Sequence, residues 1–129
     1  MSQERPNIIL IMTDQQRFDT IQAWGNDHKV TPNIDRLVAD GLSFRQAYCP
    51  GATCVASRAA TFTGMYAHNT GAYTFDDWSQ HETWIHDLAN NGYYCVNIGK
   101  MHIMPTHAPG GFDERIVVEN PTTIERWTR

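Results

Sequence analysis

One continuous apolar run constrains the fold of this chain more than any other feature. Residues 7–12 follow Pro6 and read Asn-Ile-Ile-Leu-Ile-Met, without the polar–apolar alternation of a half-exposed strand. Such a run is typical of a parallel strand that is buried on both faces. It changes abruptly to polar residues at positions 13–17, where a strand of an open α/β sheet would reach its ligand-binding end.

Two further segments have the pattern of amphipathic helices. The first opens at Thr31 and Pro32, since threonine can cap a helix and proline suits its first position, and Gly41 can end it. The second covers residues 84–91, and a second strong apolar run follows it at residues 93–98. Strands that alternate with helices indicate an α/β fold, with a mostly parallel sheet flanked by helices.

The other segments are weaker in pattern. We expect a strand over 42–48, a helix that begins at residue 54, a surface loop over 64–79, a loop over 106–111 and poorly patterned chain after it. The length suits one domain, residues 1–129, with enough apolar content to bury a core.

Composition excludes several functional classes. The net charge is −4 and no basic stripe occurs, so nucleic acid is not an expected partner. No apolar run is long enough to span a bilayer, and the polar first residues do not form a signal peptide. Three cysteines without metal-type spacing fit a reducing compartment, which predicts a cytoplasmic location and makes a zinc or redox protein a distant alternative.

The segment from Cys54 to Gly64 carries the strongest chemical signal. Cys54 stands at the expected start of a helix, where free N–H groups and partial positive charge suit an oxyanion. Arg58 follows at i+4, on the same helix face, and adds a planar cationic donor. By itself this pattern also fits a buried apolar cysteine followed by a solvated arginine.

The same segment resembles the sulfatase signature, in which Cys or Ser, any residue, Pro, any residue and Arg precede a Thr-Gly pair. The resemblance implies that Cys54 is oxidised to formylglycine, whose hydrate is the nucleophile. This chain has Ala56 in place of the usual proline, and proline favours the extended peptide that modifying enzymes read. Cys49 does not fit the signature, because Thr53 stands four residues after it.

Other pieces resemble the sulfatase family in the same order along the chain. They are residues 6–16, 31–37, 92–102 with Gly-Lys-Met-His at its end, and the Gly-Phe-Asp-Glu of residues 111–114. The resemblance covers roughly residues 6–115. It implies the amino-terminal part of an alkaline phosphatase-like sulfatase fold and a hydrolase that acts on small-molecule sulfate esters.

The resemblance also implies a divalent metal site. Asp14 and Gln15 would supply oxygen ligands, and the metal would coordinate one hydroxyl of the Cys54-derived hydrate. Calcium is the first expectation, with manganese or another divalent ion as alternatives. Gln15 stands where many sulfatases have a second Asp, and it also fits phosphonate monoester hydrolases. Without the resemblance, Asp14 would be taken as the cap of a helix that starts at Gln15.

Three more residues receive catalytic roles from the resemblance. Arg58 would hold and polarise the nucleophile, and Lys100 would neutralise a sulfate oxygen. His102 would take the proton of the second hydroxyl, so that the covalent sulfo-enzyme expels sulfate. If strand geometry persists past Gly99, the side chains of Lys100 and His102 point the same way. Alone, a Lys-x-His sequence at a strand end is more often a solvated rim than a catalytic pair.

Sulfatases are several times longer than this chain, and their remaining metal ligands lie downstream. No Asp-Asn or Asp-His pair follows Gly111, so we expect an amino-terminal portion that lacks its carboxy-terminal partner region and can self-associate as a homo-oligomer. The leading hypothesis is a formylglycine sulfatase. The alternatives are a phosphonate monoester or phosphodiester hydrolase of the same superfamily, and a non-catalytic truncated remnant.

Overall fold

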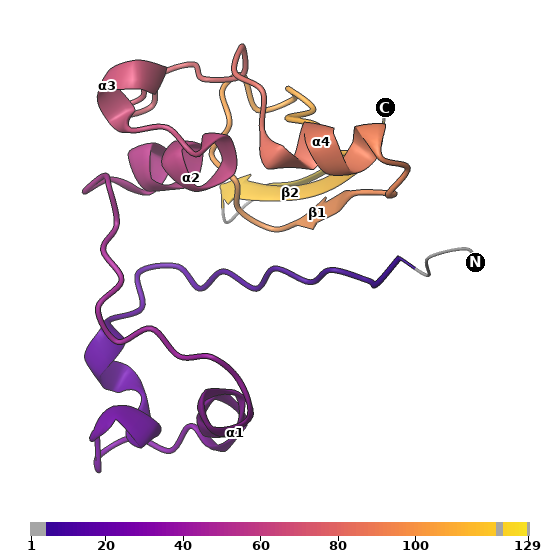
Figure 1. Cartoon of the computed structure of the whole chain (residues 1–129). Helices are drawn as coiled ribbons and strands as arrows, with labels where there is room; N and C mark the ends of the chain where they lie inside the picture. Colours follow the sequence, from indigo (N-terminus) through magenta and orange to yellow (C-terminus); the bar gives the residue numbers. More distant parts are fainter. Residues whose placement is uncertain (1–4, 121–122, 129) are drawn as a thin grey trace. The chain divides into compact units, whose positions relative to one another are not determined.

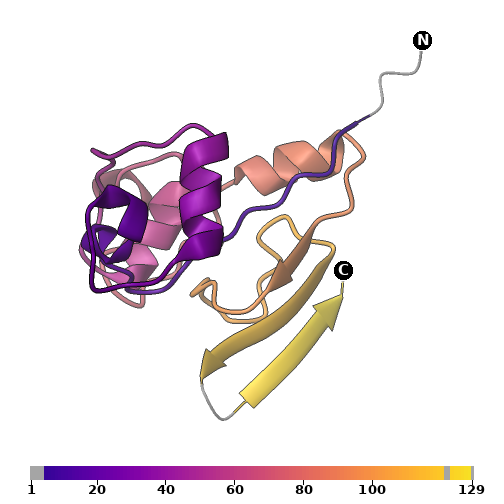
Figure 2. The ribbon, with the colours of Figure 1, turned by 90° about the horizontal axis from the view of Figure 1, so that it is seen from below.

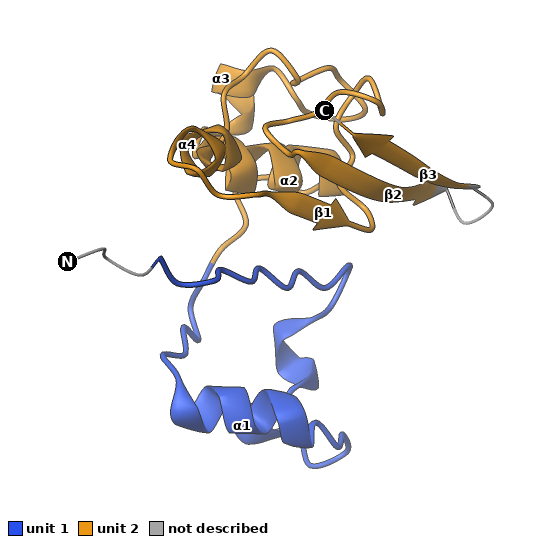
Figure 3. Cartoon of the chain, turned by 90° about the vertical axis from the view of Figure 1, so that its right-hand side faces the viewer, with its two compact units in different colours: residues 1–47 blue, residues 48–129 orange. Residues whose placement is uncertain are grey.

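A computed structural model describes residues 5–120 and 123–128 of the chain. The chain divides into two compact units, Met1–Ala47 (unit 1) and Tyr48–Arg129 (unit 2), shown in Figures 1 and 3. Each unit is described by itself below. In the part of the chain that the structure describes, no helix is both long and apolar enough to cross a membrane.

Unit 1 contains the expected helix, α1, at Pro32–Asp40, together with the short 3-10 helices η1 (Phe18–Thr20) and η2 (Gln22–Trp24). Thr31 occupies the N-cap position of α1, as expected, but its side chain makes no capping hydrogen bond to the helix backbone. Its hydroxyl instead donates to Asp35 Oδ1 over 2.9 Å, and its Oγ1 accepts the Gln22 N–H over 2.9 Å. Thr31 therefore ties α1 to η2, which satisfies a backbone N–H in a different part of the unit.

The two strands predicted for unit 1 do not form. Residues 7–12 make no strand, and Ile9 and Ile11 are 82% and 80% exposed. Residues 42–48 make no strand either. An apolar run creates a preference for burial, but a strand exists only where a neighbouring backbone accepts and donates its hydrogen bonds. Within residues 5–47, the structure describes no such neighbour.

Unit 2 is an α/β structure, as expected, and its sheet is mixed. Strand β1 (Val96–Ile98) pairs in parallel with β2 (Glu114–Asn120), and β2 pairs antiparallel with β3 (Thr123–Thr128). Figure 2 shows the last two strands side by side. Strand β1 is the carboxyl half of the apolar run at residues 93–98, so the prediction of a strand there is confirmed with a shorter length.

Three helices complete unit 2: α2 (Cys54–Thr63), α3 (Ala67–Thr70) and α4 (Trp84–Asn90). The helices predicted at residue 54 and over 84–91 are confirmed. The segment over 64–79 is more ordered than the expected surface loop, because it contains α3 and the fully buried Trp78. In Figures 1 and 3, α2 and α4 lie on the same face of the sheet.

The core of unit 2 forms between α2, α4 and β2. Phe62 of α2 stacks on Trp84 with ring centroids 5.8 Å apart and meets Phe112 edge-on at 6.1 Å. Val117 of β2 is 2% exposed, so its side chain belongs to this core. Each fully buried side chain of this size stabilises the fold by about 1.5–3 kcal/mol. This packing holds the carboxyl end of α2 against α4 and the chain before β2.

Candidate active site

The amino end of α2 is built by a side-chain cap. Thr53 Oγ1 accepts the Ala56 N–H over 3.2 Å, and the Thr53 hydroxyl donates to the Tyr73 carbonyl over 2.7 Å. Cys54 is consequently the first residue of the helix, as the sequence predicted, and it is partly buried. At the other end Gly64 adopts φ 71°, a left-handed conformation that suits glycine at a helix end.

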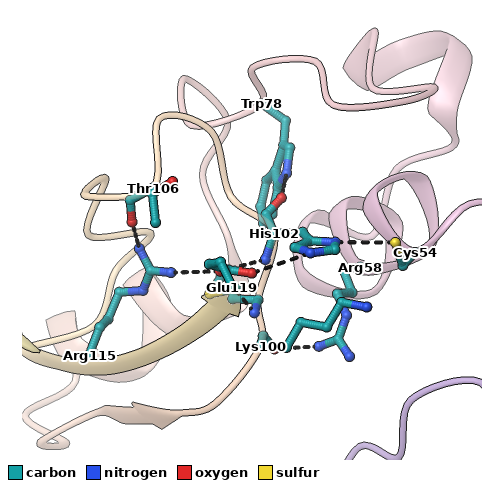
Figure 4. Close-up of polar contacts among 9 residues, drawn as sticks. Cys54, Arg58, Trp78, Lys100, His102, Thr106, Arg115 and Glu119 are labelled. Atoms are coloured by element: carbon teal, nitrogen blue, oxygen red, sulfur yellow. Dashed lines mark hydrogen bonds and ion pairs between the residues drawn. The ribbon is translucent and has the colours of Figure 1, made fainter. Parts of the chain in front are cut away.

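Cys54 meets His102, which stands 48 residues further along the chain. The Cys54 Sγ lies 3.1 Å from the His102 Nδ1. Figure 4 marks this contact with a dashed line. Phe75 contacts the imidazole edge-on with ring centroids 5.5 Å apart, and the Trp78 Nε1–H donates to the His102 carbonyl over 2.9 Å. The imidazole is therefore held in a buried setting with one nitrogen toward the sulfur.

The loop after β1 does not continue as a strand, so that expectation is corrected. Gly99 has φ 100° and His102 has φ 56°, and both values lie in the left-handed region. A left-handed residue other than glycine costs about 1–2 kcal/mol, so the surroundings must hold His102 in place. Lys100 and His102 are positioned by this turn and not by strand alternation.

Arg58 binds this loop. Its NH1 donates to the Lys100 carbonyl over 2.6 Å, and the Arg58 residue is only 7% exposed. Figure 4 shows Cys54 and Arg58 on α2 beside the loop that carries Lys100 and His102. The four residues predicted as catalytic therefore gather in one region of unit 2. A solvated arginine is excluded, because the guanidinium is buried and bonded.

The sequence reading missed Glu119, which lies on β2. Its Oε1 accepts the backbone N–H groups of Met101 and His102 over 3.1 and 2.8 Å, and its Oε2 lies 3.5 Å from His102 Nε2. The sequence carried no clear signal for it, because the alternate residues 115, 117 and 119 are Arg, Val and Glu and do not form an apolar strand face. The two charges in this set concealed the apolar pattern of a strand.

Arg115 is the other buried charge in this set and is 1% exposed. Its NH1 donates to the carbonyls of Thr106 and Ala108 over 2.7 and 2.5 Å, and its NH2 lies 3.6 Å from Glu119 Oε1. Burial lowers the pKa of Arg115, and the Glu119 carboxylate opposes that shift. The arginine thus brings a compensating positive charge to a buried carboxylate.

The expected metal ligands are divided between the units. Asp14 and Gln15 belong to unit 1, and Cys54 belongs to unit 2, so their meeting stays a prediction. Gln15 has a left-handed backbone with φ 55°. Across residues 5–120 and 123–128, no three His, Cys, Asp or Glu side chains gather as a metal site.

Comparison with known proteins identifies the family. The family model described as Sulfatase matches residues 6–129. An arylsulfatase from Clostridium perfringens is 38% identical over 111 residues, which is 84% of this chain and 23% of that protein. An N-acetylglucosamine-6-O-sulfatase from Bacteroides thetaiotaomicron is 35% identical over 114 residues, which is 85% of this chain and 20% of that protein. The chain belongs to the sulfatase family.

A solved structure supports the same assignment. BT4656, in complex with its substrate D-glucosamine-2-N,6-O-disulfate, has a TM-score of 0.80 and 32% identity to this chain. The match covers 87% of this chain and 23% of that structure. The α/β fold of a sulfatase is therefore confirmed. The chain spans about a quarter or less of the length of the relatives named here.

Proposed function

We propose that the protein containing this chain is a sulfuric ester hydrolase whose nucleophile is derived from Cys54. The contact between Cys54 Sγ and His102 Nδ1, 3.1 Å long at the amino end of α2, is the observation that carries the proposal. In a formylglycine enzyme, the Sγ position stands in for the oxygens of the hydrated aldehyde. A proton acceptor, His102 Nδ1, and the positive end of helix α2 both lie at that position.

Three residues of unit 2 would each have a separate role in this reaction. His102 Nδ1 faces position 54 and is placed to accept a proton there. Arg58, bound to the loop through the Lys100 carbonyl, brings a fixed positive charge to the same helix end. The Lys100 ammonium would neutralise an oxygen of the bound sulfate as negative charge develops.

A divalent cation belongs to this proposal. The Asp14 carboxylate and the Gln15 amide are oxygen donors, which suits calcium first and manganese as an alternative. When bound, such an ion lowers the pKa of a coordinated hydroxyl. The roles of Asp14, Gln15 and Cys54 as its ligands are expectations from the family.

Peptide mass spectrometry tests the modification. In cells that hold the modifying enzyme, we expect the peptide with Cys54 to lose mass as its CH₂–SH side chain becomes an aldehyde. Cys49 is the internal control, because it lacks an arginine four residues later and should stay a thiol. A Cys54 peptide that remains entirely a thiol would favour the third possibility, a non-catalytic remnant.

Activity of the full-length protein tests the substrate class. The panel should contain an aryl sulfate, the matched aryl phosphonate monoester and glucosamine 6-sulfate, because two relatives act on or bind sulfated glucosamine. We expect the sulfate esters to have the higher kcat/KM. A large preference for the phosphonate would instead support the second candidate, a phosphonate monoester hydrolase, which Gln15 favours.

A further inference from the structure

We propose that Glu119 is a positioning residue that sets the tautomer of the His102 imidazole. The proposal rests on the proposed function, since it concerns the nitrogen that faces Cys54. Figure 4 shows the arrangement, in which Glu119 of β2 lies on one side of the ring and Cys54 of α2 on the other. The structure places one carboxylate against both the backbone and the side chain of His102.

Glu119 holds the backbone of the loop that carries His102. Glu119 Oε1 accepts two N–H groups, from Met101 and His102, within 3.1 Å. His102 is left-handed with φ 56°, so these two bonds help to compensate for an unfavourable conformation. The Glu119 carboxylate therefore fixes the position of the backbone that carries the His102 ring.

Glu119 also faces the imidazole ring of His102. Glu119 Oε2 is buried and has no hydrogen-bond partner among the described residues, while His102 Nε2 lies 3.5 Å away. A buried carboxylate oxygen without a donor is costly, so a proton on Nε2 is favoured. When Nε2 carries the proton of a neutral imidazole, Nδ1 keeps its lone pair and faces Cys54 Sγ as an acceptor.

Arg115 keeps the carboxylate from turning away. Its guanidinium is fixed by the Thr106 and Ala108 carbonyls, and it lies 3.6 Å from Glu119 Oε1. A chain of contacts thus runs from Arg115 through Glu119 to His102 and position 54. Such outer residues orient a catalytic histidine by holding the nitrogen that does not react.

The competing explanation is that Glu119 only satisfies the two loop amides. The substitution Glu119→Gln distinguishes the proposal from this competing explanation. The Gln amide oxygen can still accept both loop N–H groups, but the Gln NH₂ would face His102 Nε2. A donor at that place favours the reverse tautomer, with the proton on Nδ1. A purely structural role predicts no change of tautomer. Glu114→Gln is the matched control, since Glu114 lies on the same strand and pairs with Arg126 at 2.8 Å.

The test is nitrogen NMR of the histidine rings in the full-length protein, with Cys54 unmodified and at mildly alkaline pH. In the parent protein we expect the His102 ring to carry its proton on Nε2. In Glu119→Gln the proton should move to Nδ1, and in Glu114→Gln it should remain on Nε2. His86 is the internal reference, because its Nδ1 accepts the Thr83 N–H over 3.0 Å and should not change. An unchanged His102 spectrum in Glu119→Gln, or a proton on Nδ1 in the parent protein, overturns the proposal.

Kinetics of the modified enzyme give a second readout. We expect Glu119→Gln to lower kcat by about 10- to 100-fold with little change in KM, as for other residues that orient a catalytic group. A parent enzyme without sulfatase activity but with the expected tautomers would sink the proposed function alone. An active parent whose Glu119→Gln variant keeps both kcat and tautomer would sink this inference alone.

Discussion

The loop after β1 in unit 2 and the polar segment after residue 12 in unit 1 are held in different ways. Residues 99–102 form hydrogen bonds with side chains far along the chain: Arg58 donates to the Lys100 carbonyl, and Glu119 accepts the His102 N–H. The contacts around residues 16–20 are local and exposed, such as the pair of Arg17 and Asp19. Exposed pairs contribute little, whereas buried bonds to a second element fix geometry.

The difference shows how a site becomes rigid. In unit 2, β2 supplies both a backbone partner for β1 and the Glu119 carboxylate for the loop that follows. The same strand therefore creates the secondary structure and positions the histidine. Unit 1 carries Asp14 and Gln15 after an apolar run that has no strand partner among residues 5–47. The role of Asp14 and Gln15 as metal ligands therefore stays a prediction.

The largest expected effect comes from testing whether the two regions serve one site. In the full-length enzyme, Asp14→Ala and His102→Ala should each lower kcat by about 10²- to 10⁴-fold. Residues that act as a unit are not additive, so the double variant should be little worse than the worse single variant. Steady-state kinetics of the four proteins measure this.

The control for this double-mutant cycle is Asp19→Ala, which changes a half-exposed residue of unit 1 whose carboxylate pairs with Arg17. It should leave kcat nearly unchanged. Fully additive effects of Asp14→Ala and His102→Ala would mean that the two residues do not meet around one reacting group.

The next largest effect concerns the buried charges of unit 2. Arg115→Met removes the positive partner of Glu119 and leaves the carbonyls of Thr106 and Ala108 without donors. Breaking a buried pair in this way destabilises a fold by about 3–5 kcal/mol. Urea unfolding should show the loss in unit 2, while the amides of α1 keep their hydrogen-exchange rates. Equal loss in both units would show that they unfold together.

Sequence reasoning succeeded where local chemistry decides the outcome. A helical period and a stop signal occur within a few residues, so the start of α2 at Cys54 and the helix α4 from Trp84 onward were predicted. The resemblance to sulfatases then selected Cys54, Arg58, Lys100 and His102, and the structure brings these residues into one region of unit 2.

The same reasoning failed where distant partners decide the outcome. Whether residues 7–12 pair, and whether residues 114–120 form a strand, depends on a neighbour that no local pattern specifies. Glu119 was missed because a buried carboxylate inside a strand is recognisable only once its donors, the amides of Met101 and His102, are in place.

A smaller effect compares one apolar residue from each unit. Val117→Thr places a hydroxyl in the core of unit 2 and should cost about 1–3 kcal/mol. Ile9→Thr changes a side chain that is 82% exposed and should alter stability by less than about 0.5 kcal/mol. Urea unfolding of the 129-residue chain, followed by amide signals of each unit, measures both. A large cost for Ile9→Thr would show that residues 7–12 are buried after all.

The smallest expected effect concerns order at the amino end of α2. Ala56→Pro restores the proline of the sulfatase signature but removes the N–H that donates to Thr53 Oγ1. Loss of the cap should cost about 1 kcal/mol, because proline is otherwise tolerated in the first turn of a helix. An extended segment is the better substrate for modification, so the fraction of Cys54 converted to aldehyde should rise.

Peptide mass spectrometry measures the conversion of Cys54, and urea unfolding measures the loss of stability. Ala56→Ser keeps the N–H and is the control for conversion, which should not change, although its hydroxyl should cost up to about 1–3 kcal/mol because Ala56 is 3% exposed. If Ala56→Pro is destabilised without a gain in conversion, the cap and the modification of Cys54 are independent.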